Sequence, residues 1–161
     1  MPLKAMATAK LGAKVPPFSV PSTSGAPFSL KDAHGEKLVL YFYPKDATPG
    51  CTTEGENFRD LHPKFRRAGV QVLGVSRDSL ASHEKFRSGM RFPFHLLSDT
   101  DETLCRLFDV IHEKNMYGRK VMGIVRSTFL IDGKGVLRQL WRKVLVTGHA
   151  EEVLEAARSI D

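Results

Sequence analysis

The stretch KLVLYFYPKDATPGCTTEGENFRDLHPKFRRAG, residues 37–69, decides the fold of this 161-residue chain. Its first seven residues form a continuous apolar run that stops at Pro44, which is typical of a strand buried on both faces. The following residues predict a helix over 48–68, with Pro49 in its first turn and Gly69 ending it. A buried strand therefore passes directly into a helix, and the junction carries Cys51.

The rest of the chain continues to alternate strands and helices. The patterns predict strands at residues 70–76 and 94–97, helices at 79–88 and 101–108, an antiparallel hairpin from 127–132 and 136–143, and a closing helix at 149–159. We therefore expect an α/β, thioredoxin-like fold with a mixed central sheet flanked by helices. Residues 1–12 are expected to form a flexible lead, residues 13–161 a single domain, and residues 116–122 a flexible loop beside the pocket.

Composition excludes several classes of protein. The net charge is +6, but the basic residues are scattered and do not alternate with aromatic ones, so we expect no nucleic-acid partner. No apolar run approaches the roughly 18 residues that cross a bilayer, so we expect no membrane segment. The six histidines lack metal-ligand spacing and no glycine-rich nucleotide motif follows a strand, so we expect no metal and no cofactor. Two cysteines are too few for a secreted disulfide scaffold, which favours the reducing cytoplasm.

Cys51 carries the chemistry that the sequence predicts. In the first turn of a helix, its sulfur faces unpaired backbone N–H groups and the positive end of the dipole, which favour the thiolate. Gly50 allows a ligand to approach the backbone closely, and the Thr48 hydroxyl lies one turn before the sulfur. Glu54 stands where a disulfide exchanger would have its second cysteine. The alternative is that Cys51 is a small hydrophobic residue at a helix start.

Several motifs together resemble the peroxiredoxins. Pro44, Thr48 and Cys51 fit the signature Pro-x-x-x-Thr-x-x-Cys. The segments TTE (52–54), VLGVS (72–76), LSD (97–99), YG (117–118) and GIVRSTFLID (123–132) are similar to the peroxiredoxin Q branch, also called bacterioferritin comigratory protein. The resemblance runs from about residue 13 to the C-terminus. It implies a thiol-dependent peroxidase, with a role in antioxidant defence, that reduces hydrogen peroxide and organic hydroperoxides.

The resemblance also implies roles for individual residues. Cys51 is then the peroxidatic cysteine, Thr48 hydrogen-bonds the peroxide and Pro44 shields the pocket. Arg126 is the guanidinium that stabilises the thiolate and the transition state. By its position alone, just before an apolar strand, it either reaches the end of a neighbouring strand or is a solvated arginine at a strand entry, and the second is favoured. Glu54 either orients Arg126 or complements the helix dipole.

The second thiol departs from the pattern of the branch. Many members carry a resolving cysteine five residues after the peroxidatic one, and here that residue is Glu56. Cys105 is either a buried core residue or the resolving thiol, within one chain or between two chains. If it is structural, an external thiol such as thioredoxin, glutaredoxin or glutathione reduces Cys51 directly. We expect a monomer, with a Cys105-linked dimer as the alternative, and a peroxide sensor as the alternative function.

Overall fold

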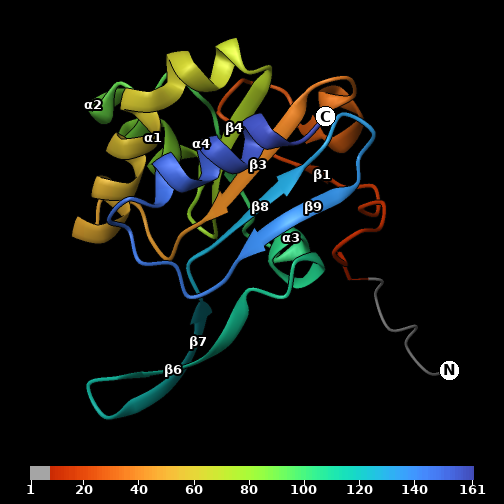
Figure 1. Ribbon diagram of the computed structural model, residues 1–161. Helices are drawn as coiled ribbons and strands as arrows, with labels where there is room; N and C mark the ends of the chain where they lie inside the picture. Colours follow the sequence, from red (N-terminus) through yellow and green to blue (C-terminus); the bar gives the residue numbers. More distant parts are fainter. Residues whose placement is uncertain (1–7) are drawn as a thin grey trace, which may run out of the picture.

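The computed structural model describes residues 8–161 and arranges them around a five-stranded sheet (Figure 1). The strand order is β5-β4-β3-β8-β9, with bounds β3 (Lys37–Phe42), β4 (Val70–Ser76), β5 (Leu96–Ser98), β8 (Ser127–Ile131) and β9 (Leu137–Trp141). β3, β4 and β5 are parallel, whereas β8 runs antiparallel to β3 and β9 antiparallel to β8. This arrangement confirms the expected mixed sheet.

Helices cover both faces of the sheet. The core on one face contains side chains of α1 (Pro49–Arg67), α2 (Leu80–Met90) and α4 (His149–Ser159), and the core on the other contains side chains of α3 (Thr103–Leu107) and the 3-10 helix η1 (Leu30–Ala33). β3 shows why both faces are filled. Leu38, Leu40 and Phe42 enter the core beside α3, and Val39 and Tyr41 enter the core beside α1. The continuous apolar run therefore belongs to a central strand with two buried faces.

Two short pairs of strands lie outside the main sheet. β1 (Ser19–Val20) pairs with β2 (Phe28–Ser29), and β6 (Ile111–Met116) pairs with β7 (Arg119–Ile124). The β6–β7 hairpin projects from the body of the molecule (Figure 1). The flexible loop expected at residues 116–122 is therefore corrected to a two-residue turn between paired strands. Tyr117 and Gly118 form the turn, and both have positive φ angles, 53° and 78°, as tight hairpin turns require.

The start of the described chain is attached to the domain. The N–H of Ala9 donates to the carbonyl of Leu107 and the N–H of Gly12 to that of Leu137, each at 2.8 Å. Of the lead expected over residues 1–12, residues 1–7 lie outside the described part. Ala9 and Gly12 are bonded to the domain, so the attached chain begins before residue 13.

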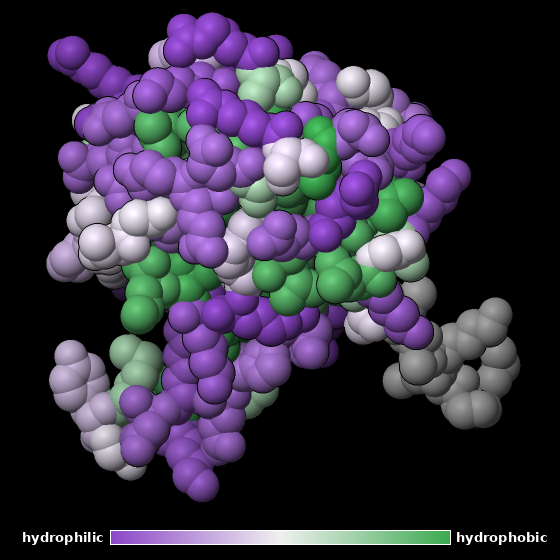
Figure 2. All heavy atoms as spheres, in the orientation of Figure 1, coloured by the Kyte–Doolittle hydropathy of each residue, from purple (hydrophilic) through white to green (hydrophobic). Residues whose placement is uncertain are grey.

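The visible surface of the protein is mostly polar, in keeping with its composition (Figure 2). Figure 2 shows polar side chains over most of the visible face and on the projecting hairpin. Within residues 8–161, no helix is long and apolar enough to cross a bilayer.

Candidate active site

The antiparallel pairing of β8 with β3 brings Arg126 to the start of α1. Phe42, the last residue of β3, pairs with Ser127, the first residue of β8. Because the two strands run in opposite directions, the residue before β8 lies beside the loop that follows β3. The structure therefore places Arg126 within the site, rather than in solvent at a strand entry.

Cys51 is the third residue of α1, and its side chain is buried, with 2% of the residue exposed. Nη2 of Arg126 lies 3.4 Å from the Cys51 sulfur and donates to it. The first hydrogen bond at this end of the helix runs from the Thr52 N–H to the Thr48 carbonyl at 2.8 Å, so the amides of Gly50 and Cys51 precede it. A guanidinium and the positive end of a helix dipole thus both face the sulfur, and both favour its anionic form.

Gly50 allows the guanidinium its close approach. A Cβ at this position would lie 3.1 Å from Nη2 of Arg126, which is tighter than ordinary packing. The sequence analysis expected Gly50 to admit a ligand to the backbone, and the group that the structure places there is Arg126.

Glu54 is one helical turn after Cys51 and binds the same arginine. Its Oε1 accepts from Nη1 of Arg126 at 2.5 Å, and the residue is 1% exposed. Burial raises the pKa of Glu54 to about 7, against the opposing effect of the Arg126 charge. Burial alone would lower the pKa of Arg126, but the negative charges of Glu54 and Cys51 outweigh it and the pKa is raised. The arginine stays charged and is shared between a thiol and a carboxyl group.

Thr48 caps α1 with its backbone, while its side chain points elsewhere. Its hydroxyl donates to the carbonyl of Lys45 at 2.8 Å and makes no bond to the helix. Because its hydrogen is engaged, the Thr48 oxygen can accept a hydrogen bond but has no free hydrogen to donate. Pro44 is half-buried in the same loop.

Cys105 lies on the opposite side of the sheet from Cys51. It belongs to the core that packs against α3, whereas Cys51 belongs to the core that packs against α1. Cys105 is fully buried, and its backbone N–H donates to Oδ2 of Asp99 at 2.7 Å. Desolvation by burial, together with Asp99, raises the pKa of this thiol well above its ordinary value. Cys105 is thus a weak nucleophile in this conformation.

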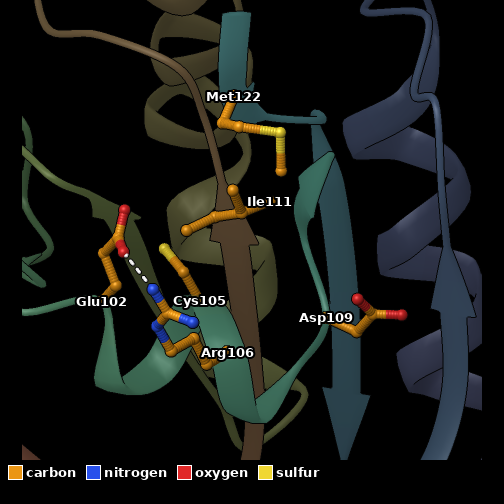
Figure 3. Close-up of a pocket in the computed structure, with 6 residues that line it drawn as sticks. All are labelled: Glu102, Cys105, Arg106, Asp109, Ile111 and Met122. Carbon is orange, nitrogen blue, oxygen red and sulfur yellow. Dashed lines mark hydrogen bonds and ion pairs between the residues drawn. The ribbon is translucent and has the colours of Figure 1, made fainter. Parts of the chain in front are cut away.

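A cavity of about 480 Å³ borders Cys105 under the β6–β7 hairpin. Figure 3 shows the Cys105 sulfur pointing towards Ile111 and Met122, with the Glu102–Arg106 ion pair at its edge. The cavity does not include Cys51 among its lining residues. It therefore offers no route by which the two thiols meet.

Lys114, on β6, is a further residue near the site that the predictions from sequence did not include. A Cβ on Gly123 would lie 3.4 Å from Cδ of Lys114, so the alkyl chain crosses the partner strand. Desolvation and the positive charge of Arg126 lower the pKa of Lys114, and Cys51 acts in the opposite direction. The hairpin thus brings a second positive charge into the field of the site. No local pattern marks this lysine, because its proximity depends on how the hairpin folds.

A thioredoxin-like fold that presents a cysteine at a helix start to a half-buried arginine is the arrangement expected of the peroxiredoxins, which are thiol-dependent peroxidases. Comparison with known proteins agrees, because the model of the AhpC/TSA family matches residues 11–140. The chain belongs to this family. Among curated relatives, it is 56% identical to peroxiredoxin Bcp of Xanthomonas campestris pv. campestris over 88% of this chain and 90% of that one. It is 44% identical to peroxiredoxin Bcp of Bacillus subtilis over 95% and 98% of the two chains.

Solved structures place the chain in the peroxiredoxin Q, or Bcp, branch. Xanthomonas campestris peroxiredoxin Q has a TM-score of 0.84 at 54% identity and covers 88% of this chain and 90% of its own. A mutant of Xylella fastidiosa PrxQ has a TM-score of 0.89 at 44% identity and covers 95% and 98%. These matches confirm the thioredoxin-like fold and the peroxidase function. None of the relatives named above is described as a peroxide sensor.

Proposed function

We propose that Cys51 is the peroxidatic cysteine and that Arg126, oriented by Glu54, holds it as a thiolate. The observation that carries this assignment is the double contact of the guanidinium, with Nη2 at 3.4 Å from the sulfur and Nη1 at 2.5 Å from Glu54. Because the guanidinium is planar and rigid, the bond from one nitrogen to Glu54 also fixes the direction in which the other nitrogen points. The anchored guanidinium supports negative charge both on the sulfur and on the oxygen that departs.

The first half-reaction consumes one hydroperoxide. The Cys51 thiolate attacks the terminal oxygen of ROOH, the S–O bond forms, and the O–O bond breaks. The departing RO⁻ takes a proton from water and leaves as an alcohol, or as water when the substrate is hydrogen peroxide. Cys51 becomes a sulfenic acid, and sulfur is oxidised while the peroxide is reduced.

Thr48 and Pro44 position the substrate in this proposal. The Thr48 oxygen accepts the O–H of the hydroperoxide, because its own hydrogen is bound by the carbonyl of Lys45. The amides of Gly50 and Cys51 donate to the peroxide oxygens, as unpaired donors of a helix start do. Pro44 limits the access of water to the same loop.

An external thiol completes the cycle. The burial of Cys105 on the other side of the sheet supports this route over a disulfide between the two cysteines. A thiol R′SH condenses with the sulfenic acid, forming an S–S bond and releasing water, and a second thiol then displaces Cys51 as a free thiol. Thioredoxin, glutaredoxin and glutathione are the candidate reductants.

The substrates in this proposal are hydrogen peroxide and organic hydroperoxides. Alkyl peroxide reduction is described for the bacterioferritin comigratory protein of X. campestris, which is 53% identical to this chain. We further propose a monomer that acts in the cytoplasm, because two buried free thiols suit a reducing compartment.

Intact mass spectrometry after one equivalent of hydrogen peroxide tests the proposal on wild type, Cys51→Ser and Cys105→Ser. We expect one added oxygen on wild type and on Cys105→Ser, and none on Cys51→Ser. Loss of two hydrogens in wild type, with the oxygen adduct only in Cys105→Ser, would show that Cys105 resolves the sulfenic acid. An unreactive Cys51 in both wild type and Cys105→Ser would reject the peroxidatic role itself.

The reductant and the oligomeric state have separate tests. Turnover of peroxide by Cys105→Ser should match that of wild type with whichever of the three thiols supports the cycle. Non-reducing gels of peroxide-treated protein should show no dimer that depends on Cys105. A Cys105-dependent dimer band would replace the monomer with the two-chain alternative.

A further inference from the structure

Asp46 lies in the loop between β3 and α1, two residues before Thr48, and it is buried, with 7% exposed. Its carboxylate accepts hydrogen bonds from the hydroxyl of Tyr43 at 2.6 Å and the hydroxyl of Ser82 at 2.9 Å. Oδ2 also lies 2.7 Å from Nδ1 of His83. Ser82 and His83 both belong to α2, so the Asp46 side chain links the loop to this neighbouring helix.

His83 has no exposed surface, and both of its ring nitrogens are engaged. Nε2 lies 2.8 Å from the carbonyl oxygen of Leu97, which can only accept, so Nε2 carries a hydrogen. Nδ1 faces an Asp46 oxygen, and one proton is therefore shared between this nitrogen and the carboxylate. Loss of either partner leaves a buried polar group unpaired, which is the costly case.

The loop that this pair holds has a strained backbone. Ala47 has a φ of 62°, in the left-handed region that residues with a Cβ rarely adopt because of steric strain. The preceding amide, of Asp46, donates to Oδ2 of Asp78 at 2.9 Å. Bonds to the side chain and to the backbone of Asp46 thus hold Ala47 in this conformation, directly before the residue that caps α1.

The side chains of Asp46, Asp78 and His83 are close enough together to suggest a metal site. One ligand atom each of Asp46, Asp78 and His83 lies within 4.8 Å of the others. Each of these atoms already has a protein partner: besides the bonds of Asp46 and His83, Oδ2 of Asp78 accepts from the hydroxyl of Ser76 at 2.5 Å. Hydrogen bonding within the protein accounts for the cluster, and it points to a positioning network.

We propose that Asp46 and His83 form a positioning pair that sets the rate at which Cys51 reacts with hydroperoxides. The pair touches neither the sulfur nor the substrate. It acts through the loop, because the Thr48 hydroxyl is bound by the carbonyl of Lys45, the residue before Asp46. A shift of this loop moves the acceptor for the peroxide O–H, which peroxide needs and an alkylating agent does not. The inference rests on the proposed function of Cys51 and Thr48.

The deciding variant is His83→Gln. The amide nitrogen of glutamine can keep the bond to Leu97, but nothing then occupies the place of Nδ1 beside Asp46. His149→Gln is the matched control, because His149 is also a buried histidine, packs against Phe58 of α1 and bonds Thr128 through Nε2 at 2.8 Å. Asp46→Asn is the conservative variant, since its amide can donate to Nδ1 and its oxygen can accept from Tyr43.

Two rate constants are measured on each folded protein. One is for oxidation of Cys51 by hydrogen peroxide, and the other is for alkylation of Cys51 by iodoacetamide, which needs a thiolate but no positioned peroxide. We expect His83→Gln to lose roughly 10- to 100-fold in the peroxide rate constant, as a small misplacement of a reacting group does, with alkylation within about threefold of wild type. Asp46→Asn and His149→Gln should stay within about threefold in both.

A peroxide rate constant of His83→Gln equal to that of His149→Gln would overturn the positioning role, and so would a parallel loss of both rate constants. If His83→Gln does not fold, Ser82→Ala decides, because it removes one hydroxyl bond to the same Asp46 oxygen. A selective, several-fold loss of the peroxide rate constant supports the proposal, and an unchanged one rejects it. Failure of wild type to react with peroxide would instead reject the proposed function.

Discussion

Gly50 and Arg126 come so close that a Cβ on the glycine would lie 3.1 Å from the guanidinium nitrogen that contacts the Cys51 sulfur. The missing side chain in the first turn of α1 is therefore a condition for the contact between arginine and thiol. Arg126 is held on its other side by Glu54, so it has little freedom to retreat.

We expect Gly50→Ala to displace Arg126 and to lower the rate constant for Cys51 oxidation by about tenfold or more, since in the proposed mechanism this contact supports charge in the transition state. Stability should not fall, because alanine favours a helix over glycine by about 1 kcal/mol. Stopped-flow oxidation and urea unfolding measure the two effects. Gly89→Ala in α2 is the control, because no atom lies within 4 Å of its new Cβ. Equal rate constants for the two variants would contradict the argument.

At Gly55, on the buried side of α1, a substitution is expected to change the stability of the fold rather than the rate constant for Cys51 oxidation. A Cβ there would overlap the ring of Phe92, which is itself buried, so the packing must shift. Gly55→Ala should lower the free energy of unfolding by about 1–3 kcal/mol, as overpacking does. Phe92→Leu makes room, and the double variant should be less destabilised than the sum of the two single ones. Additive losses in urea unfolding would show that the ring is not the obstacle.

The buried elements could be predicted from sequence because local signals coincide with tertiary ones. β3 and β4 are continuous apolar runs, and α1 begins after Thr48 and ends before Gly69, whose φ is 73°. The β6–β7 hairpin gives no such signal. Its residues are mostly exposed, so no apolar face alternates along it, and its turn places a tyrosine at positive φ in place of the usual Asn or Asp.

The residues of the candidate site also divide into those that the local sequence brings together and those that only tertiary packing brings together. Thr48, Gly50 and Cys51 lie within one turn, so their proximity follows from the chain itself. Arg126 becomes their neighbour only through the antiparallel register of β3 and β8, and only resemblance to a family placed it in the site. The contact between Asp46 and His83, separated by 37 residues, also depends on packing, here of α2 against the loop.

Acid sensitivity of the fold should involve His149. Desolvation by burial lowers its pKa to about 4, from an ordinary value of 6.5. Between these values the unfolded chain binds a proton that the folded protein does not, so stability is complete above pH 6.5 and falls as the pH drops towards 4. In urea unfolding at several pH values, His149→Gln should lose less stability over this window than wild type. An identical slope would assign the acid sensitivity to other groups.

Glu54 should shape the pH dependence of catalysis, since burial raises its pKa to about 7. Between pH 4.5 and 7, the folded protein holds a proton on Glu54 that the unfolded chain has lost. Glu54 therefore makes stability fall as the pH rises through this window. Above pH 7 its carboxylate neutralises part of the Arg126 charge and adds a negative charge beside the thiolate, which disfavours the reactive form of Cys51.

Glu54→Gln separates these effects, because the glutamine oxygen still accepts from Arg126 and carries no charge. Below about pH 6, wild type and variant both present a neutral group, and their rate constants with hydrogen peroxide should agree within about threefold. Above pH 7.5 the variant should be faster by roughly three- to tenfold, about the effect of one charge on a nearby ionisation. Stopped-flow rate constants from pH 5 to 9 test this, and an inflection near pH 7 should appear in wild type alone. If the inflection persists in Glu54→Gln, another group titrates there, and a slower variant above pH 7.5 would mean that the carboxylate charge holds Arg126 in place.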